Sequence, residues 1–114
     1  MVELRENGNL AFEIFSCGKL VGVIEYKSFW QGMPYLSLIR IAEEYRGKGI
    51  GSEAMRLFED KLRSDGERAV LVSTQVDECA QHFYRKLGYR ECGCLILEDT
   101  PFSQPMEMFF IKVL

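Results

Sequence analysis

The sequence lacks the features that would place the chain in a membrane or on a nucleic acid. No apolar run approaches the roughly 20 residues that a transmembrane helix needs, and the first residues are charged rather than an apolar leader segment. The formal net charge is -3, whereas a nucleic-acid-binding domain normally concentrates positive charge. We therefore expect neither a membrane nor a nucleic acid as a partner.

The sequence also has few residues that bind metal ions. His82 is the only histidine, and the closest two cysteines, Cys92 and Cys94, are separated by one residue. Zinc sites usually separate paired thiolates by at least two residues. We expect no metal site. We also expect free thiols and a cytoplasmic protein, because reducing compartments keep cysteines unpaired. The other two cysteines are Cys17 and Cys79.

The composition is that of an ordinary globular protein. Hydrophobic residues make up 47% and charged residues 27% of the 114 residues, and both fractions are close to the average for soluble domains. This length suits one domain with a core of its own. We therefore expect a single domain over residues 1–114.

The centre of the chain predicts a strand, a glycine-rich turn, a helix and a second strand. An apolar run predicts a strand over about 35–42, and apolar residues then repeat every three or four positions over about 49–64, as on one face of a helix. Ser64-Asp65-Gly66 ends this helix, and a continuous apolar run predicts a buried strand over 69–74. Together these elements predict a right-handed βαβ unit.

The turn has the properties of a phosphate-binding site. It reads Tyr45-Arg46-Gly47-Lys48-Gly49-Ile50-Gly51, and its alternate glycines let a ligand approach the backbone closely. The helix that follows presents unpaired N–H groups and a partial positive charge at its first turn. Neither nucleotide-binding pattern fits, because both GxxxxGK and GxGxxG require a glycine where this chain has Ser52.

The turn resembles instead a segment of the GNAT superfamily of acyl-CoA-dependent N-acetyltransferases. Arg46 to Gly51 fit that family's pattern, which is an arginine or glutamine, two residues, a glycine, one residue, and a glycine or alanine. A second segment, from Asp77 to Tyr89, resembles the family's NxxAxxxYxKxGF signature, with aspartate and tyrosine in place of its first and last residues. We predict a helix over about 77–87 in this segment.

The resemblance implies a fold, a reaction and a cofactor. The implied fold is α/β (α+β), with a mixed, mostly antiparallel sheet, a central βαβ unit and two main helices. The implied reaction transfers an acyl group from acetyl-CoA to a primary amine by direct attack on the thioester. The turn would hold the pyrophosphate of coenzyme A, and the backbone of the preceding strand would pair with the pantetheine arm. The implied cofactor-binding residues are Ile39, Ile41, Arg46, Gly47, Lys48, Gly49, Ile50, Gly51, Ser52, Asp77 and Lys86.

Tyr84 occupies the tyrosine position of the second signature. The resemblance implies that it donates a proton to the departing thiolate, and a phenol with an ordinary pKa near ~10 is protonated at neutral pH. The alternative is an ordinary helix tyrosine beside Phe83. His82 lies about 200° round the helix from Tyr84 and therefore points elsewhere. We assign no general base among the acidic residues near the predicted strands, which are Glu13, Glu25, Glu43 and Glu44.

Further strands flank the central unit. Apolar runs over 10–15 and 20–26 predict a β-hairpin, and apolar runs over 89–97 and 106–113 predict two antiparallel strands. Residues 27–34 predict a loop. Its Phe29 and Trp30 either plug the loop against the core or line a pocket for the acceptor.

One departure from the family is large. The family usually places one or two helices between its first two strands, and here only Ser16 to Lys19 separate the first predicted pair. The acceptor site is then either open or completed by a partner subunit, so we expect a homodimer that covers Phe29 and Trp30. A non-catalytic CoA-binding regulatory or interaction module is the alternative to an enzyme. The identity of the amine and the length of the acyl chain stay open.

Overall fold

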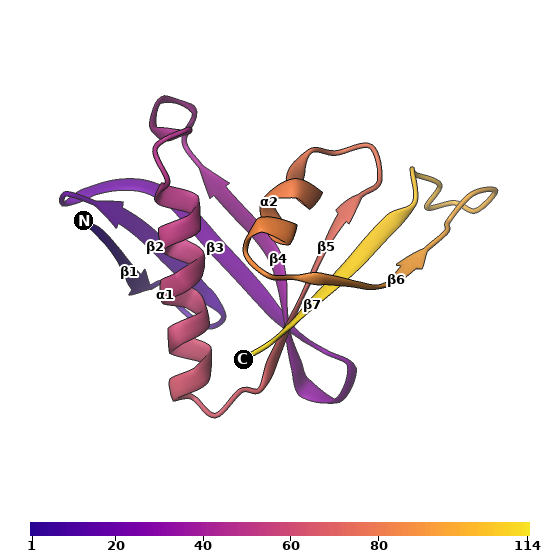
Figure 1. Cartoon of the computed structure of the whole chain (residues 1–114), viewed down its shortest axis with the longest axis horizontal. Coiled ribbons are helices and arrows are strands. Elements are labelled where there is room, and N and C mark those ends of the chain that lie inside the picture. Colours follow the sequence, from indigo (N-terminus) through magenta and orange to yellow (C-terminus); the bar gives the residue numbers. More distant parts are fainter.

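The computed structural model describes residues 1–114, which form one seven-stranded sheet with two α-helices on the same face (Figure 1). The strand order across the sheet is β1-β2-β3-β4-β5-β7-β6. The elements are β1 (Val2–Glu6), β2 (Ala11–Ser16), β3 (Lys19–Phe29), β4 (Met33–Ile41), α1 (Ile50–Ser64), β5 (Ala69–Gln75), α2 (Ala80–Lys86), β6 (Arg90–Leu95) and β7 (Glu107–Val113), with short 3-10 turns at Trp30–Gly32 and Glu43–Tyr45.

Neighbouring strands pair antiparallel everywhere except between β4 and β5, which run parallel. Because α1 connects these two strands, they form the βαβ unit that the sequence predicts. The predicted fold class is confirmed: the sheet is mixed and mostly antiparallel, and it carries two main helices.

The core lies between the sheet and the helices. Ala54, Met55 and Phe58 of α1 have no exposed surface, so the apolar face of the helix is fully covered. The buried residues that pack with them come from most strands and include Ile14, Ile24, Val70, Val72 and Phe110. This packing fixes α1, and with it the glycine-rich turn, against the middle of the sheet.

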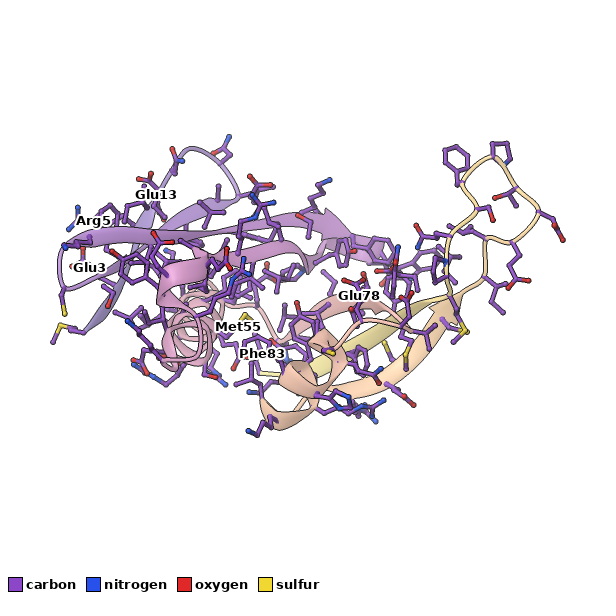
Figure 2. The ribbon with its side chains drawn as sticks, turned by 90° about the horizontal axis from the view of Figure 1, so that it is seen from above. Glu3, Arg5, Glu13, Met55, Glu78 and Phe83 are labelled. Atoms are coloured by element: carbon purple, nitrogen blue, oxygen red, sulfur yellow. The ribbon has the colours of Figure 1, made fainter.

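The sequence-based prediction omits β1 and starts the sheet at residue 10. In the structure β1 pairs with β2 from Val2–Ser16 to Glu6–Phe12. Its charged side chains, among them Glu3 and Arg5, hide the strand pattern because one face of this edge strand meets solvent (Figure 2). The first two strands are therefore joined at residues 7–10, not at 16–19 as predicted, and no helix lies between them.

The predicted loop over 27–34 is wrong. β3 continues to Phe29 and β4 begins at Met33, so the two strands form a tight hairpin. Pro34 obscured this strand in the sequence, yet its missing N–H costs nothing there because β4 first pairs with β5 at Tyr35. Phe29 is 44% and Trp30 73% exposed, so neither residue plugs the core.

The two helices match the prediction to different degrees. α1 has nearly its predicted bounds, whereas α2 begins at Ala80 and is shorter than the predicted helix over 77–87. The N–H of Glu78 donates to the carbonyl of Gln75 at 3.0 Å, and this turn occupies the expected first helical residues. Neither helix is long and apolar enough to cross a membrane.

Candidate active site

β4 and β5 separate near the middle of the sheet. They pair only at Tyr35 with Leu71 and at Leu36 with Val72, although both strands continue toward the upper end of the sheet in Figure 1. A bulge helps to turn β4 away, because Ser37 has no partner where the pairing with β3 shifts by one residue. We call the opening between the two strands the gap.

Two residues of β4 present their backbone to the gap. Ala42 donates its N–H to Val21 of β3 at 2.8 Å, and backbone groups of an antiparallel strand alternate in direction. The N–H and C=O groups of Ile41 and Ile39 therefore point away from β3 and into the gap. Their side chains are partly buried against the core.

The glycine-rich turn leads from the end of β4 into α1. Gly47 and Gly49 have positive φ values of 74° and 80°, which favour glycine. Gly49 caps the helix without any side-chain hydrogen bond, and the first helical bond runs from Glu53 N–H to the Gly49 carbonyl at 3.1 Å. The N–H groups of the first turn therefore have no partner within the helix. This end of α1 suits an anion.

A cavity of about 260 Å³ lies between the turn, the end of β4 and α2. Phe83 of α2 closes one side of it, and a side-chain carbon added at Gly51 would lie 3.5 Å from the Phe83 ring. Figure 2 shows Phe83 beside Met55, between the two helices. The lining residues are Ile41, Tyr45, Arg46, Gly47, Gly49, Ile50, Gly51, Ser52 and Phe83. The structure thus brings together seven of the residues expected to bind the cofactor.

The other expected cofactor residues lie outside this cavity. Lys48 lines a neighbouring hollow with Met1 and Glu53, and its ammonium lies 5.8 Å from the centre of the Tyr45 ring. Asp77 and Lys86 are exposed. Neither of them makes a side-chain hydrogen bond or an ion pair within the chain.

Arg46 has a structural contact as well. Its Nε donates to the carbonyl of Ile41 at 2.7 Å, so the side chain folds back over the end of β4. This bond fixes the direction in which the turn leaves the strand. The remaining N–H groups of the guanidinium are free to meet an anion in the cavity.

Tyr84 is buried in α2, with 7% of its surface exposed. Its ring packs edge to face on Tyr89 at 5.8 Å and lies 6.4 Å from Phe110. Burial, followed by the nearby Tyr35 and Glu78, raises the pKa of Tyr84 to about 12. With this pKa the hydroxyl keeps its proton at neutral pH. It has no hydrogen-bond partner in the chain and can therefore donate to a ligand.

A hydrogen bond crosses the closed end of the gap. The hydroxyl groups of Tyr35 in β4 and Ser73 in β5 lie 2.7 Å apart, on the sheet face opposite the helices. On the helix side, the neighbouring Thr74 hydroxyl is fully buried and unpaired. The structure also shows no group of three or more metal-binding side chains and no disulfide.

Sequence reasoning missed two residues of this region. The first is Phe83, which lines the cavity, and its position one residue before Tyr84 could have placed it toward the turn. The second is Glu78, which lies in the turn before α2. Its side chain accepts a hydrogen bond from the backbone N–H of Gln75 at 3.0 Å, a contact that no residue pattern announces. His82 is exposed, as its angle predicts.

A sequence model of the acetyltransferase (GNAT) family matches residues 3–89. The chain therefore belongs to the GNAT acetyltransferase family. The match covers both segments that carry the resemblance, the glycine-rich turn and the helix with Tyr84.

Curated relatives share parts of the chain. N-alpha-acetyltransferase 30 of Schizosaccharomyces pombe is 34% identical over 56 residues, which are 48% of this chain and 37% of that protein. Streptothricin acetyltransferase A of Bacillus subtilis is 27% identical over 84 residues, which are 73% of this chain and 49% of that protein. The chain thus spans half or less of the length of the curated relatives it matches.

A solved structure of similar length has the same fold. It is a GNAT family acetyltransferase from Elizabethkingia anophelis with acetyl-CoA bound. The TM-score is 0.81 at 12% identity, and the match covers 100% of this chain and 97% of that one. Identity this low establishes the fold alone.

Proposed function

We propose that this protein binds acetyl-CoA and transfers its acetyl group to a primary amine. The observation that carries the proposal is the uncapped end of α1, whose unpaired N–H groups face a cavity that also reaches the end of β4. Membership of an acetyltransferase family supports it, as does the acetyl-CoA bound in a similar fold of similar length.

The turn has the chemistry that a pyrophosphate requires. Unpaired N–H groups at Ile50, Gly51 and Ser52 and the dipole of α1 favour a negative charge, and Arg46 adds a fixed positive charge to the same cavity. The backbone groups of Ile39 and the N–H of Ile41 can pair with the amides of an extended arm in the gap, whereas the Ile41 carbonyl already accepts a hydrogen bond from Arg46. Lys48, Asp77 and Lys86 stay predicted contacts for the outer part of the ligand.

Bound acetyl-CoA supplies a thioester, whose carbonyl accepts a neutral amine. This chain contributes by positioning, because the turn and β4 would hold acetyl-CoA rigidly. Tyr84 contributes a hydroxyl that keeps its proton at neutral pH and can donate it to a departing thiolate. One relative is named as an N-alpha-acetyltransferase and another as a streptothricin acetyltransferase, so the acceptor amine stays open.

The binding test uses two glycines in the same conformation. Gly49 and Gly66 have φ values of 80° and 88°, and a side-chain carbon added at either would meet nothing within 4 Å. Gly49→Glu places a carboxylate at the anion site, and Gly66→Glu places one in the turn after α1. We expect calorimetry to show acetyl-CoA binding by the wild type and Gly66→Glu, and none by a folded Gly49→Glu.

Turnover distinguishes the enzyme from a non-catalytic binding module. Spermidine, kanamycin, a lysine peptide and a peptide with a free N-terminus are offered with acetyl-CoA, and released thiol is measured. Thiol release with one of these amines supports the enzyme. Binding of acetyl-CoA without any turnover would support the regulatory or interaction module, and equal binding by both glutamate variants would remove the turn from the proposal.

We also propose that the protein forms a homodimer through the helix-free face of the sheet. A groove of about 420 Å³ lies there, and nine of its ten lining residues are hydrophobic, including Trp30, Leu71 and Phe109. Phe29, Trp30 and Leu95 at its rim are all more than 40% exposed, and an apolar surface of this kind favours a partner. A cytoplasmic location stays a prediction.

A further inference from the structure

Glu78 lies at the gap, although it belongs to the turn that follows β5. Its Oε1 accepts the backbone N–H of Gln75 at 3.0 Å, while the N–H of Val76 donates to Met106 on the β7 side at 2.8 Å. Because backbone groups alternate in direction along the strand, the N–H of Gln75 points away from β7 and toward β4. The carboxylate that binds this N–H therefore lies on the β5 side of the gap.

The carboxylate is available to a ligand. Glu78 is exposed, and none of the ion pairs of the chain includes it. Its Oε2 accepts no hydrogen bond. In the view from above, Glu78 lies apart from Phe83 and Met55 and beside the strands (Figure 2). A negative charge without a counter-ion therefore faces the gap.

The groups around Glu78 are suited to a cationic nitrogen. Tyr84 belongs to α2, which begins two residues after Glu78, and Tyr35 and Glu78 add to the effect of burial in raising the pKa of its hydroxyl. The hydrogen bond between the hydroxyl groups of Tyr35 and Ser73 closes the gap at the end where β4 and β5 pair. No lysine or arginine is paired with any of these side chains, so an ammonium group would not compete with a resident cation.

We propose that Glu78 binds the acceptor amine in its ammonium form and accepts the proton that the nitrogen must lose before it can attack. The inference rests on the proposed acetyl transfer. One N–H bond of the ammonium breaks, its electron pair stays on nitrogen as the lone pair, and an O–H bond forms at Oε2 of Glu78. Because Glu78 is exposed, water then carries the proton to the solvent. The acceptor class is primary amines that are cationic at neutral pH.

A glutamine at position 78 separates this role from a structural one. Glu78 holds its turn with two bonds to Gln75, one from its own N–H and one to its side-chain oxygen. Glu78→Gln keeps an oxygen for the second bond but removes the charge. We expect it to fold and to bind acetyl-CoA like the wild type, while kcat/KM for the amine falls by about 100-fold.

Glu107 provides the matched control, because it lies opposite Gln75 on β7 and its carboxylate accepts a hydrogen bond from the Gln104 side chain at 3.1 Å. Glu107→Gln removes a nearby charge without touching the gap side of β5. We expect its kcat/KM to stay within about twofold of the wild type. If Glu107→Gln lowered kcat/KM as much as Glu78→Gln does, the effect would come from the loss of any nearby negative charge. That result would overturn the proposal.

A binding measurement keeps this test independent of turnover. Calorimetry with the four amines named above, on protein saturated with CoA, measures the acceptor site without any reaction. Weaker amine binding by Glu78→Gln than by the wild type supports the role of Glu78, even if no amine is acetylated and the proposed transfer fails. If Glu78→Gln acetylated and bound the amine as well as the wild type does, the role of Glu78 would be overturned and the proposed transfer would stand. A wild type that neither binds nor acetylates any amine would overturn both.

Discussion

Glu59 of α1 accepts a hydrogen bond of 2.8 Å from the hydroxyl of Tyr89, which follows α2. Its second oxygen lies 2.8 Å from the ammonium of Lys112 on β7, and that ammonium also donates to the Leu87 carbonyl at 2.7 Å. Glu59 is 4% exposed. This group of three side chains joins α1, the end of α2 and β7, so it fixes the helix that carries Tyr84.

Removing Lys112 should therefore destabilise the fold. Lys112→Met leaves a buried carboxylate without its main counter-ion, and we expect a loss of about 3 kcal/mol in the free energy of unfolding. Lys61→Met removes two exposed ion pairs, with Asp65 and Glu6, and should change stability little. Urea unfolding measures both variants, and equal losses would show that the buried contacts contribute no more than surface ones.

Tyr84 and Tyr89 should make stability fall at alkaline pH. Burial raises the pKa of Tyr84 to about 12, and burial together with Glu59 raises the pKa of Tyr89 above its usual range. Above a pH of about 10 the unfolded chain loses these protons while the folded protein keeps them, so the unfolded state binds fewer protons and stability declines. The stabilisation is complete below that pH and decreases as the pH rises toward the folded pKa.

Urea unfolding at about pH 9 and about pH 11 measures this decline, and Tyr84→Phe and Tyr89→Phe identify its source. We expect each phenylalanine variant to lose about 1 kcal/mol less than the wild type over that interval. The comparison cancels the titration of lysines, which all three proteins share. The same loss in the wild type and both variants would contradict the raised pKa values.

Much of the fold follows from local patterns in the sequence. The apolar repeat of α1 and the continuous apolar run of β5 predict the βαβ unit because both elements are buried. β1 and the hairpin at Phe29–Met33 escaped prediction for physical reasons: an edge strand carries charges on its solvent face, and Pro34 is tolerated where β4 has no partner on the β5 side.

The candidate site was predictable where it depends on backbone conformation. Glycines before a helix indicate an anion site, and the cavity brings Arg46 and Gly47 to Ile41 as expected. The contributions of Glu78 and Tyr35 depend on the separation of β4 from β5, which is a tertiary relationship. No spacing in the sequence reports that the N–H of Gln75 faces a gap instead of a strand.

The proposed dimer predicts a specific effect of Trp30. Trp30→Asp places a charge at the rim of the apolar groove on the helix-free face, so sedimentation should show a lower average mass than for the wild type at high protein concentration. Phe102 is equally exposed, at 76%, but lies outside the lining of the groove. Phe102→Asp should leave association unchanged, and a wild type that stays monomeric at every concentration would exclude the dimer.

The last prediction concerns the hydroxyl of Tyr84, because a proton donor and a packing residue change different constants. Tyr84→Phe keeps the ring contacts with Tyr89 and Phe110 and removes only a group that has no hydrogen-bond partner in the chain. If that hydroxyl donates to the departing thiolate, kcat on the best amine should fall by about 100-fold while the affinity for CoA is nearly kept.

Tyr89→Phe is the matched control, since its hydroxyl bonds Glu59 in the core at 2.8 Å. We expect this variant to lose stability but to keep its kcat, the reverse of Tyr84→Phe. A normal kcat in Tyr84→Phe would exclude the donor role. Catalysis would then rest on positioning by the turn and by the backbone of Ile39 and Ile41, together with the carboxylate of Glu78.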